Sequence, residues 1–420
     1  MRSRFNPVAA IVVLVTFGSS GAAFAQTPEA CGGPKAKITK KVDKPLGEAQ
    51  KASNEKNWEE VLVKVAEAEA VPVEKSEYDR YWINEFKGNA HANRKSYAEG
   101  FTALEAGFKS PCMSEEDKPR RTKILMQLAY QAKNYPQSVE YGKLAVQLNP
   151  GDLETINYLG NAYFQIDDNQ NARVTMADYI AKMEASGKVP EEQGYRILQT
   201  ACLRLKDDNC VTEQIEKLVA HYPKPTYWTD LINSLLRVSK SDNELLNILR
   251  LADGAQVMNE PSHYTEMAQL AMAQGLPGEA QSIIEKGNQK KVFAGSQREG
   301  DHASRILADA KQAVTLDKST LDKQDASARA KTTGDSDVKL GAAYLSYGMN
   351  DKAIEALQRG IGKGSVKNPD EAGLLLGIAY LRMNNKEEAL KAFQTVKQNP
   401  TMVRIAKLWA LNTEKGSGTG

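Results

Sequence analysis

The chain has 420 residues, of which 26% are charged and 7% are aromatic, and its formal net charge at pH 7 is +2. A nearly neutral chain with interspersed charges lacks the basic surface that nucleic-acid binding requires, so we expect no nucleic-acid partner. Pro is sparse and apolar residues are frequent, and this composition favours neither a disordered chain nor a β-sandwich.

The first 25 residues have the pattern of a secretory signal peptide. Arg2 and Arg4 precede an apolar run of about ten residues, and small residues then lead to Ala23-Phe24-Ala25, a typical cleavage site. The run is too short to cross a bilayer, and no second run of that kind follows. We therefore predict cleavage before Gln26, a periplasmic location and no stable membrane insertion afterwards. Loss of Arg2 and Arg4 would bring the net charge from +2 to 0.

Four cysteines follow the predicted signal peptide. An even number of cysteines in an exported chain predicts two disulfides. Cys202 and Cys210 lie on either side of a predicted turn between two helices, which would bring them close together. We therefore predict the pair Cys202–Cys210 and, by elimination, the pair Cys31–Cys112. The alternative is that some of the four are buried free thiols.

Apolar residues recur at three- and four-residue spacing along almost the whole remaining chain, which predicts helices. Three stretches also share one longer pattern, Leu-Gly, then Tyr three residues after the Gly, then Ala nine residues after the Tyr. They are residues 159–172, 340–353 and 376–389. A spacing that recurs in this way indicates that one structural unit is used several times.

The length of that unit is visible between Pro119 and Leu153, which are 34 residues apart and both begin a helix–turn–helix pattern. This period and the Leu-Gly-x-x-Tyr…Ala pattern resemble the tetratricopeptide (TPR) repeat. In that repeat the small residues let the paired helices approach closely, and a closing Pro stands where Pro150 and Pro223 stand here.

The resemblance implies an all-α fold, a right-handed α-solenoid of about ten TPR-like helix-turn-helix units. The units are expected to begin near Val42, Tyr81, Pro119, Leu153, Glu192, Thr226, Pro261, Gln297, Gly334 and Asp370. We expect a signal peptide over 1–25, a flexible segment over 26–41, repeats over 42–296, a degenerate pair over 297–333, two repeats over 334–400, a capping helix over 401–412 and a flexible tail over 413–420.

The second half of the chain also resembles a family of exported TPR proteins of proteobacteria for which no activity is established. The residues that carry the resemblance are Tyr222–Pro225 with Trp228, Met267–Ala271 with Gly275–Ala280, and Lys363-Gly364 with Lys367–Ala372. The resemblance supports the fold and the location more than any particular task.

No motif in the chain predicts catalysis. Gly360–Ser365 has the look of a phosphate-binding loop but lacks its spacing and the preceding strand. The four histidines, His91, His221, His263 and His302, have no Cys, His or carboxylate partner at metal-ligand spacing. We expect no enzyme activity, no cofactor and no metal site.

A binding surface is the remaining expectation. In TPR arrays the concave groove is lined mainly by the first helix of each unit, and those positions fall here on Arg120, Lys123, Gln127, Tyr130, Asn157, Asn161, Phe164, Arg196 and Arg204. Lys123 stands where some TPR proteins hold a peptide's terminal carboxylate, but Gln127 replaces the expected Asn. The alternative is that these are ordinary solvated residues.

Together these features predict a periplasmic adaptor or scaffold that binds a protein or peptide in the cell envelope. One alternative is an accessory subunit of an inner-membrane energy-transducing or secretion complex. Another is a solute-binding protein or an enzyme built on a helical solenoid. A pocket with convergent polar groups would favour the last of these, and a long open groove would favour the scaffold.

Overall fold

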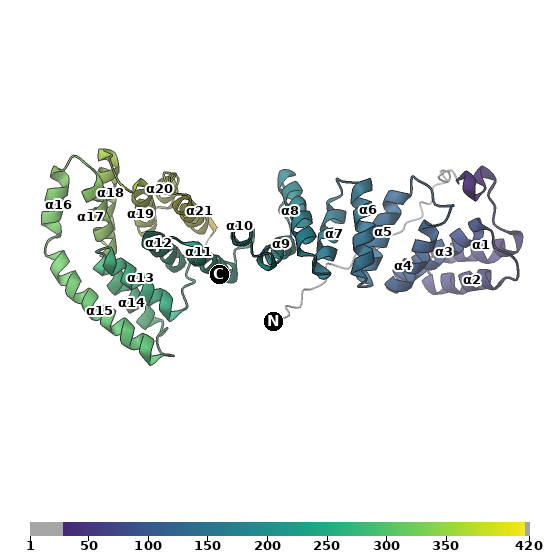
Figure 1. Cartoon of the computed structure of the whole chain (residues 1–420), viewed down its shortest axis with the longest axis horizontal. Helices are drawn as coiled ribbons and strands as arrows, with labels where there is room; N and C mark the ends of the chain where they lie inside the picture. The colour runs from purple at the N-terminus through teal and green to yellow at the C-terminus, as the bar shows by residue number, and fades with distance from the viewer. Residues whose placement is uncertain (1–27, 416–420) are drawn as a thin grey trace. The chain divides into compact units, whose positions relative to one another are not determined.

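A computed structural model describes residues 28–415 of the chain (Figure 1). Within this range the chain forms α-helices and two short 3-10 turns, and no strand, which confirms the all-α prediction. The predicted signal peptide lies outside the described residues. None of the described helices has both the length and the apolar composition needed to span a membrane.

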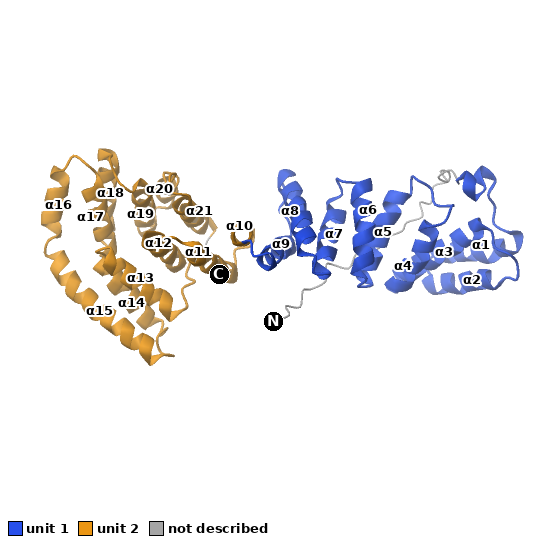
Figure 2. Ribbon diagram, in the orientation of Figure 1, with its two compact units in different colours: residues 1–207 blue, residues 208–420 orange. Residues whose placement is uncertain are grey.

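The chain divides into two compact units, which Figure 2 colours separately: unit 1 covers residues 1–207 and unit 2 covers residues 208–420. Unit 1 contains α1 (Lys40–Asn54), α2 (Trp58–Ala70), α3 (Glu77–Asn93), α4 (Tyr97–Phe108), α5 (Lys118–Gln131), α6 (Tyr135–Leu148), α7 (Leu153–Gln165), α8 (Asn169–Ala185) and α9 (Glu192–Arg204). Unit 2 contains α10 (Asp208–His221), α11 (Pro225–Val238), α12 (Asp242–Gly254), α13 (Pro261–Ala273), α14 (Pro277–Gln289), α15 (Gln297–Lys318), α16 (Leu321–Ala330), α17 (Asp335–Ser346), α18 (Asn350–Lys363), α19 (Pro369–Arg382), α20 (Lys386–Phe393) and α21 (Pro400–Lys415).

Neighbouring helices pack as pairs, and each pair packs against the next. In unit 1 the pairs are α1–α2, α3–α4, α5–α6 and α7–α8, and in unit 2 they include α13–α14, α17–α18 and α19–α20. The first helices of these pairs begin within a few residues of the predicted unit starts. Serial packing of this kind is that of an α-solenoid, as predicted.

The turn inside the pair is the same structure used eight times. Two residues after the end of the first helix comes a residue with a positive φ, and the N–H of the residue that follows it donates to the carbonyl five positions earlier, at 2.8–3.0 Å. This geometry satisfies carbonyls that a helix end leaves without a partner. The residues with positive φ are Lys56, Lys95, Lys133, Asp167, Lys206, Gly275, Gly348 and Asn384. The turns after α11 and α15 lack it, and these belong to units with a weak repeat pattern.

The glycines of the repeated pattern lie where the two helices of a pair approach most closely. A Cβ at Gly160 would clash with Met176, one at Gly341 with Leu357, and one at Gly377 with Phe393. The Ala residues at the far end of the pattern, at 172, 353 and 389, have no exposed surface. The spacing seen in the sequence therefore marks the contacts between the paired helices.

The segment 26–41, for which flexibility was expected, contains two 3-10 turns, Glu29–Cys31 and Gly33–Lys35. Cys31 forms a disulfide with Cys112, with the two Cα atoms 4.9 Å apart. Asp79 accepts hydrogen bonds from the backbone N–H and the hydroxyl of Thr39, at 2.8 and 2.6 Å, and its carboxylate also caps α3 through Ser76. The other predicted disulfide, Cys202–Cys210, joins residues on the two sides of the unit boundary and stays a prediction.

The last helix does more than cap the final repeat. α21 packs on α19 and α20, where the rings of Trp409 and Phe393 stack at 6.1 Å, and it also packs on α12. Arg404 pairs with Glu216 of α10 at 2.7 Å. Asp370 accepts the backbone N–H groups of residues 397–399 and so sets the turn that precedes α21. α21 therefore connects the last helices of unit 2 with its first ones.

Candidate functional site

The predicted surface on unit 1 lies along α5, α7 and α9, which contact one another in series. Its central cation, Lys123, pairs with Asp152 and Glu154 of the next repeat, each at 2.7 Å. Gln127 donates to the same Glu154 at 3.0 Å. Partial burial acts to lower the pKa of Lys123, but the hydrogen bonds to the two carboxylates raise it overall. Lys123 is thus already paired with two carboxylates of the chain itself.

Other members of the predicted surface are also engaged between repeats. Asn161 is buried and donates to Asn157, while Gln193 of the following repeat donates to Asn161 at 2.9 Å. Phe164, one of the predicted groove positions, is buried, and the guanidinium of Arg204 covers its ring at 4.9 Å. These side chains hold adjacent repeats together, because the first helices of neighbouring units lie side by side.

The remaining predicted residues are more accessible. Arg120 is exposed and pairs with Asp117 at 3.2 Å. Tyr130 is half-buried and meets the rings of Tyr135 and Tyr158 edge-on, and Arg196 is half-buried. The partner-binding role of this surface stays a prediction.

Unit 2 carries a hollow face along the corresponding helices α13, α17 and α19. Two cavities open there, of about 710 Å³ and about 690 Å³. Ala342 of α17 and Leu375 of α19 line both cavities, so the two adjoin. We call their combined lining the unit 2 groove. The first cavity is also walled by α12 and α21, and the second by α15 and α16.

A buried ion pair lies in the wall of the first cavity. Arg250 of α12 donates two hydrogen bonds to Glu279 of α14, at 2.7 and 2.6 Å, and a third to Asn247 at 2.9 Å. Burial acts to raise the pKa of Glu279, but the charge and hydrogen bonds of Arg250, helped by Arg382, hold it below its ordinary value. Glu279 is therefore a carboxylate, already paired, and is not available to a ligand.

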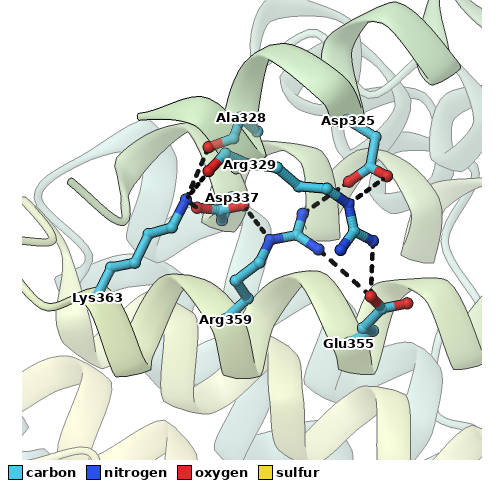
Figure 3. A network of polar contacts seen from close by, with 7 residues as sticks. All are labelled: Asp325, Ala328, Arg329, Asp337, Glu355, Arg359 and Lys363. Carbon is cyan, nitrogen blue, oxygen red and sulfur yellow. Dashed lines mark hydrogen bonds and ion pairs between the residues drawn. The ribbon is translucent and has the colours of Figure 1, made fainter. Parts of the chain in front are cut away.

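Helix α16, which forms one wall of the second cavity, is held in place by ion pairs and hydrogen bonds, as Figure 3 shows. Arg359 of α18 pairs with Asp325 of α16 at 2.7 Å and with the fully buried Asp337 of α17 at 2.6 Å. Lys363 pairs with Asp337 and donates to the carbonyls of Ala328 and Arg329 at the end of α16. α16 buries only two apolar side chains of its own, so this network supplies much of its attachment.

Replacing Arg359 with Ala is expected to loosen α16 while leaving the α17–α18 pair folded. Hydrogen exchange across residues 321–330 should become roughly tenfold faster, because a network of several ion pairs is lost where little apolar packing replaces it. Slight burial acts to raise the pKa of Asp325, but its hydrogen bonds to Arg329 and Arg359 lower it. The contribution of Asp325 to the attachment should therefore be complete above pH 3.8, the ordinary value, and be lost as the pH falls through the lower folded value.

The matched control for this variant is Arg305→Ala, which removes an exposed arginine on α15 that forms no ion pair among the described residues. Exchange in α16 should be unchanged there. Equal exchange rates in both variants and the parent would show that apolar packing alone holds α16.

The sequence interpretation missed the unit 2 groove although a signal was present. Arg382 occupies, in the first helix of the last repeat, a position that was named as lining the groove in unit 1. Extending the positions named in unit 1 to the last repeat therefore identifies Arg382. The wall made by α21 had no such signal, because it depends on contacts between residues more than a hundred positions apart, such as Asn247 with Met402.

Three comparisons place the chain beside known proteins. No protein-family model matches the chain, and no curated protein matches it. Among solved structures, the chain is similar to MamA protein (14% identity, TM-score 0.23, covering 67% of this chain and 91% of that one). It is also similar to a tetratricopeptide repeat protein from Parabacteroides merdae (10% identity, TM-score 0.29, covering 79% and 98%).

A third similar structure is the C-terminal part of a TPR repeat-containing protein from Cytophaga hutchinsonii (11% identity, TM-score 0.35, covering 64% and 98%). The fold of the chain is TPR-like. At these identities the likeness concerns the fold alone, and the TPR-like assignment stands on the paired helices, their shared turn and the close contacts at the glycines of the pattern.

Within the TPR-like repeats of unit 2, the groove carries both apolar and charged side chains. Its described lining contains apolar side chains on α17 and α19 and cations at the rim. Among residues 28–415, no cluster of three or more His, Cys, Asp or Glu side chains is placed to hold a metal ion.

Proposed function

We propose that the protein is an exported scaffold that binds a segment of a protein partner in the unit 2 groove. The observation that carries this proposal is the pair of adjoining cavities, about 710 and about 690 Å³, on the face formed by the first helices. Each falls in the size range of pockets that hold a ligand. Because the two cavities share Ala342 and Leu375, a single extended segment can occupy both.

The lining of the groove supports a peptide ligand. Leu345, Leu375 and Ile378 present apolar surface at its base, while Gln256, Ser346 and Asn384 add polar groups at the edge. A peptide offers apolar side chains together with a main chain that must be hydrogen-bonded, so both kinds of contact are needed. The concave face of a repeat array is also the surface that such arrays use to bind partners.

A photo-crosslinking experiment tests the groove directly. A photoreactive amino acid placed at Lys339, on α17 within the groove, should capture a partner in cells. The matched control is Lys352, which is exposed on α18, the other helix of the same pair, outside both cavities. Capture of the same partner with equal yield at both positions, or only at Arg120 in unit 1, would reject the unit 2 groove. A captured subunit of an inner-membrane complex would identify the protein as its accessory.

The periplasmic location is part of the proposal and has its own test. It is supported by the signal-peptide pattern of residues 1–25 and by the disulfide between Cys31 and Cys112, because disulfides persist in oxidising compartments. After expression in a bacterium with two membranes, the periplasmic fraction should contain a chain that begins at Gln26, as read by N-terminal sequencing. Replacing the apolar run with polar residues should retain the protein inside the cell with Met1 or Arg2 at its start.

A second candidate function, binding of a small solute, is favoured by one feature of the first cavity. Helices α12, α17, α19 and α21 all contribute to its lining, so side chains from several helices surround it. Native mass spectrometry of the purified chain distinguishes the two functions. A bound small molecule of defined mass that is lost when Trp409 or Arg382 is replaced would favour the solute over the peptide.

A further inference from the structure

The first helix of unit 1 and the segment before it concentrate positive charge. Residues 35–51 contain six lysines and two acids, a net charge of +4, although the whole chain carries only +2. The other residues are therefore net negative, and such an asymmetry points to an anionic partner. All six lysines are exposed and form no ion pair among the described residues. They are Lys35, Lys37, Lys40, Lys41, Lys44 and Lys51.

Three of these lysines form a row along α1, which we call the lysine stripe. Lys40, Lys44 and Lys51 are spaced by four and seven residues, so they lie on one face of the helix. Gly47 lies between them on the same face, and a Cβ at that position would meet no other atom. The apolar residues of α1 lie on the opposite face, in the core of unit 1. The lysine stripe is therefore an open row of amines.

The fold holds the lysine stripe in a fixed position. Asp79 of α3 accepts two hydrogen bonds from Thr39, the residue before α1. The disulfide between Cys31 and Cys112 holds the preceding segment, and α1 packs on both α2 and α3. The amines are thus presented by a folded surface, which keeps their charges together.

The neighbouring acids do not neutralise the lysine stripe. On α2, which packs on α1, Glu60 and Glu67 pair with Lys64. The same Lys64 pairs with Glu48 of α1 at 3.2 Å. Asp43 is the only other acid of α1, and it is exposed. The positive charge of the stripe therefore remains available to a partner from outside the chain.

The chemistry of the lysine stripe suits an extended anionic surface. A lysine is a point charge on a flexible stem, whereas recognition of a single phosphate or carboxylate in a fixed geometry favours the planar fork of arginine. The face of a helix that points away from the core can lie along a plane. The headgroups of anionic phospholipids form such a plane, and helix faces rich in lysine are attracted to it.

We propose that the lysine stripe of α1 binds the anionic phospholipid headgroups of a membrane surface, without insertion of the helix into the bilayer. This inference goes beyond the proposed function and does not depend on it, because the stripe belongs to unit 1 and the groove to unit 2. A chain that used both surfaces would hold its partner at the membrane. Attachment through charge alone is reversible and weakens as salt is raised.

Vesicle flotation tests this proposal. It uses the purified chain from Gln26 onward, because the apolar run within residues 1–25 would bind lipid by itself. The vesicles contain phosphatidylcholine alone or with about one third phosphatidylglycerol. The chain should float with the anionic vesicles and not with the neutral ones, and raising the salt from about 0.05 M to about 0.5 M should release it.

Two variants assign the binding to the lysine stripe. Lys40→Gln/Lys44→Gln/Lys51→Gln should weaken binding to the anionic vesicles by roughly a hundredfold, because each lysine beside an anionic surface contributes about fivefold. Asp43→Asn should strengthen binding by about two- to fivefold, because it removes the exposed acid of the same helix. A gain of this kind cannot come from misfolding, and thermal unfolding checks that the triple variant is folded.

The matched control is Lys95→Gln/Lys143→Gln/Lys188→Gln, which removes the same charge from unit 1. These three lysines are exposed and form no ion pair among residues 28–415. They belong to three different repeats, so they form no common stripe. Binding of the control should stay within about twofold of the parent, because the effect of a charge falls off within a Debye length of the surface.

The outcomes distinguish a membrane from other anionic partners. Equal binding to neutral and anionic vesicles, or equal losses in the two triple variants, would reject the lysine stripe as a membrane-binding surface. Binding to duplex DNA at the same salt without binding to vesicles would replace the membrane by a nucleic acid as the partner. Photo-crosslinking at Lys339 tests the scaffold function separately, so each proposal can fail without the other.

Discussion

Replacing Arg250 with Met is expected to destabilise unit 2 by about 3–5 kcal/mol, because it leaves a carboxylate buried without its partner. Arg250 and Glu279 are both buried, and no other residue forms an ion pair with Glu279 among the described residues. The double variant Arg250→Met/Glu279→Met should recover most of the loss, since two apolar side chains of similar size can replace a buried ion pair.

The measurement is urea-induced unfolding, with hydrogen exchange used to assign the transition to unit 2. The matched control is Arg80→Met in unit 1, which removes a pair between Arg80 and Glu77 that is half exposed on both sides. That change should cost little, because exposed pairs contribute about 0–1 kcal/mol. Equal costs for Arg250→Met and the double variant would show that the arginine acts through packing and that the charge of Glu279 is unimportant.

The ion pair between Arg250 and Glu279 also predicts how the stability of unit 2 changes with pH. In the parent chain the pKa of Glu279 is lowered below 4.5, so its stabilising effect is present above pH 4.5 and is lost as the pH falls through the lower folded value. In Arg250→Met burial acts alone and should raise that pKa, so Glu279 can take up a proton and become neutral. The cost of the substitution should therefore shrink on acidification and grow as the pH rises above 4.5.

Removing the disulfide between Cys31 and Cys112 is expected to destabilise unit 1 by about 2–4 kcal/mol. The bond closes a loop over a sequence separation of 81, which contains α1–α4. Such a bond limits the conformations of the unfolded chain, and here it also holds the turns of residues 28–35 against unit 1. The variant Cys31→Ser/Cys112→Ser, unfolded in urea, should show the loss in unit 1 and leave unit 2 unchanged.

Reductant provides the control for this prediction. The parent chain should lose the same stability in unit 1 when it is reduced. Any further effect of reductant on Cys31→Ser/Cys112→Ser must come from Cys202 and Cys210, so the experiment also tests their predicted pairing. If neither the variant nor the reductant changes unfolding of unit 1, the disulfide has no stabilising role.

The repeat pattern predicted the helix pairs well, and for a local reason. Each glycine of the pattern faces a large side chain about sixteen residues later, as Gly160 faces Met176 and Gly341 faces Leu357. Because the two helices of a pair are joined by a short turn, spacing along the chain reports directly on contact in space. The positive φ of Lys56, Lys95 or Lys133 had no such signal, since lysine does not favour that conformation and the repeated turn imposes it.

The candidate site was predicted less well, because its side chains are engaged by residues from other repeats. Lys123 looked available in the sequence and is paired with Asp152 and Glu154 in the structure. Arg382 and Lys386 drew no attention in the sequence and remain without ion pairs among the described residues. A cation is free to bind a partner only where the next helix places no acid beside it. One sequence does not reveal how neighbouring helices are aligned, so it does not reveal which cations are paired.

The sequence by itself determined the helices, their pairing and the TPR-like repeat, because these depend on spacings of a few to about forty residues. Only the tertiary structure decided where the binding face is hollow. The first cavity exists because α21 packs on α12 as well as on α19 and α20, and the second because ion pairs hold α16 beside α17. Both walls result from the stacking of successive helix pairs in unit 2. Small rotations between neighbouring pairs accumulate along the array, and no single position in the sequence encodes their sum.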